Sequence, residues 1–300
     1  MNAKTCLIVN PTAGRGAARS RIHEVRAAFA AYGITDVRET RLAGDEEKLA
    51  ALAIQQGVET VVAVGGDGTC ARIAGAVLGS ERPCRLAVVP CGTGNDFAKT
   101  LGVSSYTADQ VAELVERAPP TLIDVGNIDG DHFVNSCGFG FDASVLQATE
   151  RVRFLKGDAI YIYSALRQLF TYRGFDVSVR RSSSADAQKM LMLTVSNGCF
   201  LGGAFRIAPH ASVLDGELDV SFFGDCDLID RVRLFSGALR GTHLGLTSVK
   251  TQRVRKMTLR FPAPPMMELD GELRQALSST VQIECVPRAL NVIAAPGYPL

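Results

Sequence analysis

The chain has 300 residues, of which 47% are hydrophobic and 21% charged, and this profile excludes a disordered protein and fits one large domain or two of ordinary size. Its 32 Lys and Arg residues against 31 Asp and Glu residues leave a formal charge of +1. That balance argues against nucleic acid as a partner, which favours strongly basic domains, and provides no polybasic tail for anionic membranes.

The amino-terminal segment and the cysteines predict a cytoplasmic protein. The first apolar run stops at Asn10-Pro11, so it is too short for the hydrophobic region of a secretory signal and is typical of a buried strand. No stretch approaches the roughly 20 apolar residues that a membrane-spanning helix needs. The eight cysteines include no C-x-x-C pair. We therefore expect buried, reduced thiols rather than zinc ligands or disulfides.

Over the first 120 residues, short apolar runs alternate with helix-like segments. Strands followed by helices in this way predict a doubly wound parallel α/β sheet. The expected strands are 5–10, 37–41, 60–64 and 85–90, and the expected helices are 19–32, 46–56, 70–78 and 109–117.

After Pro119-Pro120 the pattern changes to one that is mainly β. Two strand-like runs meet at Asp129-Gly130, which indicates a plain hairpin, and helices are expected near 158–171 and 227–240. The further strand candidates are 175–181, 190–197, 218–224, 256–261, 266–272 and 280–286.

These patterns predict two domains, of which the second is an antiparallel β-sandwich. The first domain is expected to cover residues 1–124 and the second residues 125–287. The last segment, 288–300, contains the apolar run LNVIAA, which could complete the first domain; the sequence leaves this open.

Three glycine-rich loops follow predicted strands of the first domain. They are NPTAGRG (10–16), GGDGT (65–69) and CGTGND (91–96). Ligands of parallel sheets bind beyond the carboxyl ends of the strands, and helix N-termini supply backbone N–H groups for anions. Neither of the usual nucleotide signatures, G-x-x-x-x-G-K-[ST] or G-x-G-x-x-G after the first strand, is present. The three loops still favour a phosphate site over ordinary turns, with the hydroxyls of Thr69 and Thr93 as additional donors.

Two carboxylates, Asp67 and Asp96, lie within these loops. A carboxylate repels phosphate unless a cation lies between them, so both side chains suggest Mg²⁺ bound together with substrate phosphates. Asp96 has a second interpretation, as the cap of the helix that begins FAKTL, and the two roles are compatible.

Taken together, the motifs resemble those of the diacylglycerol kinase catalytic family, specifically its soluble bacterial lipid kinases. GGDGT alone also occurs in NAD kinases and phosphofructokinases, but its combination with P-x-G-T-x-N-D-F-A is far more specific. The matching motifs follow the family's order over nearly the whole chain: NPTAG (10–14), GGDGT (65–69), PCGTGNDFA (90–98), GFGFDA (138–143), PHASVLDGELDV (209–220) and LDGE (269–272).

The resemblance implies a nucleotide-binding α/β domain of the NAD kinase and diacylglycerol kinase type, a β-rich lipid-binding domain, and a lipid cleft between them. Ala13 departs from the family, which commonly has serine there, and we expect weaker nucleotide binding at most. By resemblance, the residues that contact ATP are Asn10, Pro11, Thr12, Ala13, Gly14, Thr40, Gly65, Gly66, Asp67, Gly68, Thr69, Cys70, Ala71, Thr93 and Asn95.

The resemblance also assigns the general base to Glu272, in the late D-G-E motif, although LDGEL would equally suit a solvated hairpin. It implies a mainly structural magnesium site at the D-G-x-L-D loop, formed by the Asp215 side chain and the carbonyls of Ser212 and Glu217. Asp215-Gly216 is in either case a turn. A second magnesium ion would arrive with ATP, near Asp67 and Asp96.

The function expected from these features is an ATP- and Mg²⁺-dependent lipid kinase. Diacylglycerol, giving phosphatidic acid, is the first candidate, ahead of phosphatidylglycerol and sphingoid bases. The alternatives are a soluble kinase resembling NAD kinase and a nucleotide-binding regulatory module without turnover. Residues 151–173 mix arginines with large apolar residues and suit either an interfacial helix or, as we favour, a helix packed on the β-domain. We expect weak, transient, peripheral membrane contact, and the sequence is silent on oligomeric state.

Overall fold

The computed structural model describes residues 4–149, 159–179 and 187–300. The chain divides into two compact units, one formed by residues 1–123 with 288–300 and the other by residues 124–287. Each unit is described by itself below.

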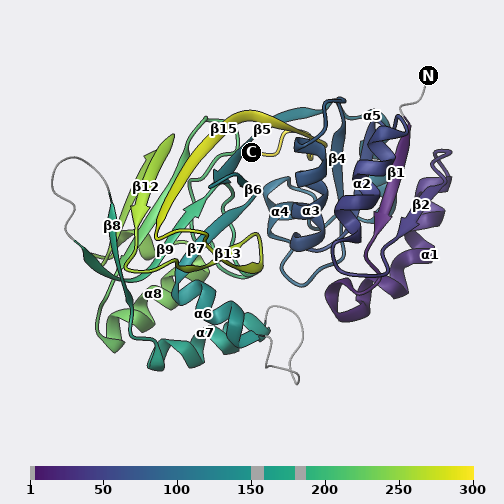
Figure 1. Ribbon diagram of the computed structural model, residues 1–300. Coiled ribbons are helices and arrows are strands. Elements are labelled where there is room, and N and C mark those ends of the chain that lie inside the picture. Colours follow the sequence, from purple (N-terminus) through teal and green to yellow (C-terminus); the bar gives the residue numbers. More distant parts are fainter. Residues whose placement is uncertain (1–3, 150–158, 180–186) are drawn as a thin grey trace. The chain divides into compact units, whose positions relative to one another are not determined.

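The first unit contains a four-stranded parallel sheet in the order β4-β3-β1-β2 (Figure 1). Its central strands are almost wholly apolar, because helices cover both faces of such a sheet. Next to β4, the last residue of β15, Val292, pairs with Leu86. The strands are β1 (Thr5–Val9), β2 (Asp36–Glu39), β3 (Thr60–Gly65) and β4 (Arg85–Pro90).

Helices cover this sheet as the alternating sequence predicts. α1 and α5 share one apolar core with every second residue of β1, β3 and β4, whereas α2 and α3 pack against each other and against β1 and β3. A capping box between Thr107 and Gln110 starts α5. The helical segments are η1 (Ala13–Gly16), α1 (Ala17–Ala30), α2 (Asp45–Gln55), α3 (Asp67–Leu78), α4 (Asp96–Thr100) and α5 (Ala108–Arg117).

The second unit is a β-sandwich of largely antiparallel strands, which confirms the expected fold class. One layer runs β14-β13-β7-β9-β10-β11 and the other β8-β12-β15-β5-β6, with β8 also pairing with β9. Apolar residues of both layers form one core between them. The strands are β5 (Thr121–Ile128), β6 (Asp131–Phe133), β7 (Ser136–Gly140), β8 (Phe175–Val179), β9 (Gln188–Ser196), β10 (Leu218–Gly224), β11 (Val249–Val254), β12 (Lys256–Arg260), β13 (Met266–Leu269), β14 (Glu272–Gln275) and β15 (Thr280–Val292).

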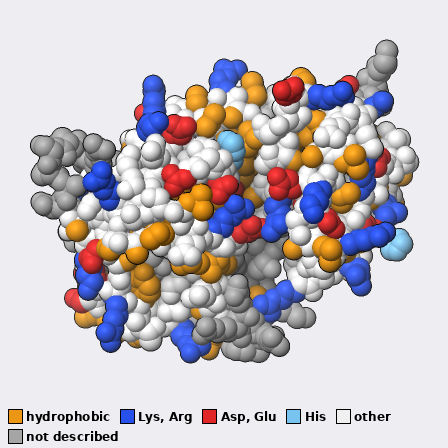
Figure 2. Space-filling model, in the orientation of Figure 1, with side chains coloured by type: hydrophobic (Ala, Val, Ile, Leu, Met, Phe, Trp, Pro, Cys, Tyr) orange, Lys and Arg blue, Asp and Glu red, His pale blue; other side chains and the backbone are white. Residues whose placement is uncertain are grey.

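Three helices pack on the outer face of the first layer of the sandwich: α6 (Phe141–Thr149), α7 (Ala159–Thr171) and α8 (Leu228–Arg240) (Figure 1). A short turn, η2 (His243–Gly245), follows α8. Within the described residues, no helix has the length and hydropathy needed to cross a membrane. Acidic and basic side chains are interspersed over the face seen in Figure 2, in keeping with the net charge of +1.

One strand expectation is wrong. Residues 266–272 do not form a single strand, because the chain reverses at Asp270-Gly271 and β14 pairs antiparallel with β13. Both turn residues have positive φ, +47° and +86°, as a two-residue hairpin with an Asp-Gly turn requires. The alternation of polar and apolar residues continues through this turn, which is why the sequence looks like one strand.

Candidate active site

In the first unit, the loop after β1 is fixed by the side chain of Asn10. Its Nδ2 donates to Glu46 Oε1 (3.0 Å) and to Thr69 Oγ1 (3.1 Å). Its Oδ1 accepts from the N–H (3.0 Å) and the hydroxyl (2.7 Å) of Thr12. Since Glu46 lies in the first turn of α2 and Thr69 in the first turn of α3, Asn10 joins the end of β1 to two helices.

The GGDGT loop leads directly from β3 into α3 and is in close contact with the loop after β4. A Cβ atom on Gly66 would lie 2.9 Å from the Cα of Gly92, and one on Gly92 only 2.3 Å from the Cα of Gly66. A Cβ on Gly65 would lie 2.5 Å from Thr69 Oγ1. The two loops therefore require glycine because their backbones touch.

The CGTGND loop is held by its own amide side chain and by Asp67. Asn95 Oδ1 accepts from the N–H of Gly92 (2.8 Å), and Asn95 Nδ2 donates to the carbonyl of Gly92 (3.1 Å). Asp67 Oδ1 accepts from the N–H of Phe97 (3.0 Å), in the first turn of α4. Asp67 thus caps a helix that belongs to the neighbouring loop.

Asp96 is buried as the first residue of α4, and its Oδ1 lies 3.1 Å from Lys99 Nζ. The N-cap of this helix is Asn95, in a left-handed conformation. The hydrogen bond to Phe97 described above comes from Asp67, so it is Asp67 that performs the capping expected of Asp96.

The structure brings the three predicted loops together at the carboxyl edge of the sheet. Thr40 joins them, because its N–H donates to the carbonyl of Val9 (2.9 Å), the residue before Asn10. Cys70 and Ala71 follow in α3, and Thr93 lies in the loop after β4. This edge has the features that bind phosphates: close-packed glycine backbone, hydroxyls and the N-terminus of the 12-residue helix α3.

In the second unit, Glu272 follows a turn that Asp270 anchors. The buried Asp270 carboxylate accepts from the N–H groups of Val134 (2.7 Å), Asn135 (2.8 Å) and Ser136 (3.0 Å). Burial raises the pKa of Asp270 to about 6, against the opposing effect of these three hydrogen bonds. Glu272 itself is partly exposed and lies 3.3 Å from Arg274.

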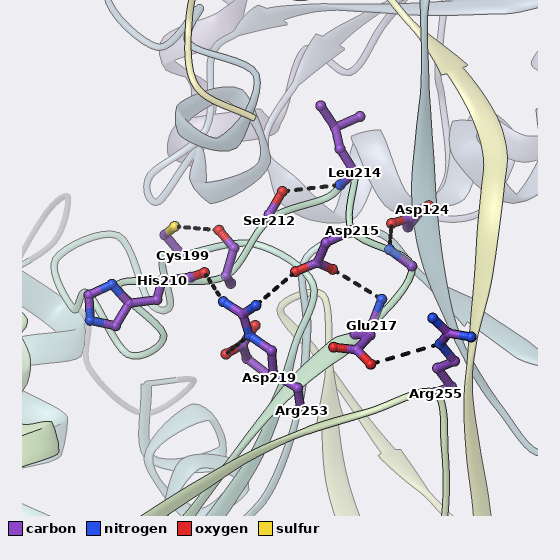
Figure 3. Close-up of polar contacts among 12 residues, drawn as sticks. Asp124, Cys199, His210, Ser212, Leu214, Asp215, Glu217, Asp219, Arg253 and Arg255 are labelled. Carbon is purple, nitrogen blue, oxygen red and sulfur yellow. Dashed lines mark hydrogen bonds and ion pairs between the residues drawn. The ribbon is translucent and has the colours of Figure 1, made fainter.

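The predicted metal loop lies in the same unit and is drawn in Figure 3. Asp215 Oδ1 accepts from the N–H of Glu217 (3.0 Å), and Ser212 Oγ accepts from the N–H of Leu214 (3.3 Å). The buried Asp124 accepts from the N–H of Gly216 (2.6 Å). These bonds curl the backbone around the Asp215 side chain.

Charges around this loop bear on whether a cation fits it. Asp215 Oδ2 lies 3.5 Å from Arg253 Nη1, and Asp219 Oδ1 lies 3.7 Å from Arg253 Nε (Figure 3). Asp219 Oδ2 is buried and has no hydrogen-bond partner among the described residues. The Glu217 carboxylate lies 3.8 Å from Arg255 Nε. One carboxylate together with carbonyl oxygens is a donor set that suits Mg²⁺, so the loop fits this ion. Arg253 would compete with the ion for the Asp215 carboxylate.

Two apolar pockets flank the first turns of α6. The narrower one, about 70 Å³, is walled mainly by α6, α7 and α8 and includes Asp142 and Arg231. The wider one, about 460 Å³, is walled largely by aromatic and aliphatic side chains, among them Phe139, Phe261 and Leu273. Leu273 is the residue after Glu272, so the wider pocket adjoins the hairpin that carries the predicted base.

Four carboxylates lie in or beside these sites although the sequence pattern did not single them out. Glu46 resembles any acid in the first turn of a helix, and Asp124 and Glu268 sit in ordinary strand patterns. Only Asp142 carried a signal, since it belongs to the GFGFDA motif. These residues are Glu46, Asp124, Asp142 and Glu268.

Both units match models of known families. Residues 4–128 match the diacylglycerol kinase catalytic domain, and residues 135–294 match the YegS C-terminal NAD kinase beta sandwich-like domain. The chain therefore belongs to the diacylglycerol kinase and YegS-like lipid kinase family, and it is a lipid kinase that uses ATP as co-substrate.

Individual relatives agree with this assignment. The chain is 25% identical to the diacylglycerol kinase of Bacillus subtilis (strain 168), over 89% of this chain and 88% of that protein. It is 31% identical to the "Probable lipid kinase YegS-like" of Alcanivorax borkumensis, over 88% of each. A crystal structure of a diacylglycerol kinase from Bacillus anthracis str. Sterne covers 98% of both chains with a TM-score of 0.73 at 22% identity, which supports the fold.

Proposed function

We propose that this lipid kinase phosphorylates diacylglycerol to phosphatidic acid, with phosphatidylglycerol and sphingoid bases as the next candidates. The observation that carries the choice of a lipid acceptor is the wider apolar pocket, because it adjoins the hairpin of Glu272 and has room for part of an acyl chain. The narrower pocket, about 70 Å³ against about 460 Å³ for the wider one, offers far less room for such a chain.

In this proposal the first unit binds ATP. The loops at Asn10–Gly14 and Gly65–Ala71 and the threonines Thr40 and Thr93 hold the nucleotide, with Asn95 keeping its loop in shape. Asp67 and Asp96 are the residues that would hold a magnesium ion bound with the phosphates. That ion would neutralise the negative charge that develops on the phosphoryl group during transfer.

The second unit binds the lipid and supplies the base. Glu272 accepts the proton of the lipid hydroxyl while the oxygen of that hydroxyl forms the new bond to the γ-phosphorus. The bond from the γ-phosphorus to its bridging oxygen breaks, and ADP leaves. A carboxylate in this role contributes about 10²–10⁴-fold to the rate.

At the D-G-x-L-D loop, we propose that a structural magnesium ion is bound by the Asp215 carboxylate and the carbonyls of Ser212 and Glu217. Support comes from the curled backbone and from the excess of carboxylates over nearby cations; one of these carboxylates is Asp219, whose Oδ2 atom is buried. Its role would be to hold the loop before β10, away from the chemical step.

The proposal includes peripheral membrane contact from a cytoplasmic enzyme, through α7 and α8. Arg231 of α8 donates to the carbonyls of Leu169 (3.1 Å) and Tyr172 (2.7 Å), so α8 meets the end of α7. The buried face of α7 packs on the sandwich, which is the alternative favoured above for residues 151–173. Of these, residues 151–158 lie outside the described part of the chain. The outward side chains form what we term the α7–α8 patch: Tyr163, Leu166, Phe170, Leu228, Ile229 and Val232, each 39–65% exposed.

Replacing Phe170 and Ile229 together by serine should weaken binding to phosphatidylglycerol-containing vesicles. Burying a large apolar side chain contributes about 1.5–3 kcal/mol, so the double variant should bind at least about tenfold more weakly in a sedimentation assay. Leu42→Ser, which removes an even more exposed apolar side chain from the first unit, is the control. Equal vesicle binding by wild type and double variant would rule out the α7–α8 patch as the contact.

The proposed reaction is tested by incubating the protein with labelled ATP and Mg²⁺ and a panel of acceptors. The panel contains dioleoylglycerol, phosphatidylglycerol and sphingosine in mixed micelles, with NAD as the soluble acceptor. We expect labelled phosphatidic acid, and its loss when a chelator removes Mg²⁺. Phosphorylation of another lipid would correct the substrate, label on NAD would favour the soluble kinase, and ATP binding without any product would favour a regulatory module.

A further inference from the structure

A second carboxyl pair lies beneath the hairpin that carries Glu272. In the antiparallel register, Glu268 of β13 lies directly opposite Gly138 of β7. The space where Gly138 would carry a side chain is filled by Asp142, because a Cβ atom there would lie 1.8 Å from Asp142 Oδ2. Opposed residues of neighbouring strands project from the same face, so the carboxyl groups of Glu268 and Asp142 lie side by side.

Glu268 is shielded from solvent, and Asp142 is shielded at one of its two carboxyl oxygens. Glu268 is only 3% exposed, and both Glu268 Oε2 and Asp142 Oδ2 are buried atoms. Burial, followed by the charge of Asp142, raises the pKa of Glu268 well above its usual value. Among the described residues, the other groups that act on the pKa of Glu268 include Asp270 in the turn, and Glu268 in turn acts on the thiol of Cys137 on β7. The guanidinium of Arg231 lines the pocket that Asp142 also lines. Two adjacent carboxyl groups, of which that of Glu268 is buried, cannot both ionise at low cost.

Glu268 also contacts the turn itself. Its Oε1 accepts the N–H of Gly271, the residue immediately before Glu272. Its Oε2 has no hydrogen-bond partner among the described residues, and a proton held between it and Asp142 would satisfy it. One glutamate therefore links the α6 carboxylate to the backbone of the D-G-E turn.

We propose that Glu268 and Asp142 share one proton and that Glu268, through the N–H of Gly271, is a positioning residue for Glu272. The inference rests on the role proposed above for Glu272. Asp270 holds one side of the turn through the backbone of residues 134–136, and protonated Glu268 holds the other. Loss of either contact frees a turn whose two residues both have positive φ.

Two substitutions separate this role from simple packing. Glu268→Gln keeps an oxygen for Gly271 and offers an N–H to Asp142, so it reproduces the protonated glutamate without titrating. Glu268→Met keeps the size and removes both polar contacts. With dioleoylglycerol in mixed micelles, we expect kcat of the glutamine variant within about threefold of wild type, and kcat of the methionine variant lower by about 10²-fold, the usual cost of a misplaced catalytic group. KM for ATP should be unchanged in both.

The shared proton has its own readout. A raised pKa in the folded state means that the native protein keeps a proton that the unfolded chain releases, so wild type loses stability as pH rises from 5 towards 9. Glu268→Gln does not titrate and lacks this loss. The difference between its Tm and that of wild type should therefore shift in favour of the variant as pH rises across this range. If the Tm values of wild type and Glu268→Gln changed in parallel with pH, the shared proton would be ruled out. This test does not depend on whether Glu268→Met folds.

The activity assays carry a matched control and an internal check. Glu284→Gln, which removes a strand carboxylate paired with Lys256 at the surface, should match wild type throughout. Wild-type kcat in Glu268→Met, or an equal loss in the glutamine and methionine variants, would overturn the positioning role. Glu272→Gln assayed alongside separates the two proposals: if it retains turnover, the base assignment fails, whereas the Tm comparison still decides the shared proton.

Discussion

Glu272→Gln is expected to lower kcat by about 10²–10⁴-fold while leaving the affinity for ATP unchanged. The amide has nearly the shape of the carboxylate but cannot accept the proton of the lipid hydroxyl. ATP affinity is expected to stay the same because Glu272 is not among the residues proposed above to hold the nucleotide. Single-turnover assays with dioleoylglycerol measure the chemical step, and equilibrium dialysis with labelled ATP measures binding.

The control for this variant is Asp131→Asn. Arg274 lies 3.3 Å from both Asp131 and Glu272, so Asp131→Asn disturbs the same ion-pair group without touching the proposed base. An equal loss of kcat in the two variants would assign the effect to Arg274 and remove Glu272 from the role of base.

Gly92→Ala should have the second large effect, on ATP binding. The added methyl group would lie 2.3 Å from the Cα of Gly66, and backbone cannot move aside as a flexible side chain can. Overpacking of this kind costs about 1–3 kcal/mol, and it would separate two of the loops proposed to hold the phosphates of ATP. We expect Kd for ATP to rise at least about tenfold, measured by calorimetry, with a lower Tm.

Gly75→Ala is the matched control, because a Cβ atom there meets nothing within 4 Å and the residue lies inside α3. This substitution should raise stability by about 0.4–1 kcal/mol and leave ATP binding unchanged. If Gly92→Ala bound ATP as tightly as Gly75→Ala does, the contact between the two loops would not matter for the nucleotide.

Much of the fold could be predicted because its signals are local. The strands of the first unit are apolar runs bounded by glycine loops, and their alternation with helices sets the parallel sheet. The turn at Asp270-Gly271 was harder, since Met266 to Glu272 alternates through it like one strand. The pairing of β13 with β7 depends on residues about 130 positions apart, and no local pattern contains it.

The candidate site divides in the same way. Asn10, Gly66 and Asp67 could be placed at the sheet edge from their motifs, although the capping of α4 by Asp67 depends on a contact between loops. Glu268 could not be found, because an isolated glutamate in a strand has the same sequence pattern whether it is buried or exposed. Its burial follows from Gly138 having no side chain and Asp142 occupying that space.

The path of β15 bears on how the protein is made. Its residues 280–287 belong to the second unit, and Val292 pairs with Leu86 of the first. Ala295 then donates to the carbonyl of Leu101, and the ring of Tyr298 lies against Gly102. Because a protein is synthesised from its N-terminus, the first unit cannot complete the edge of β4 until residues 288–300 have left the ribosome. Residues 288–300 thus complete the first unit only after the whole second unit, residues 124–287, has been synthesised.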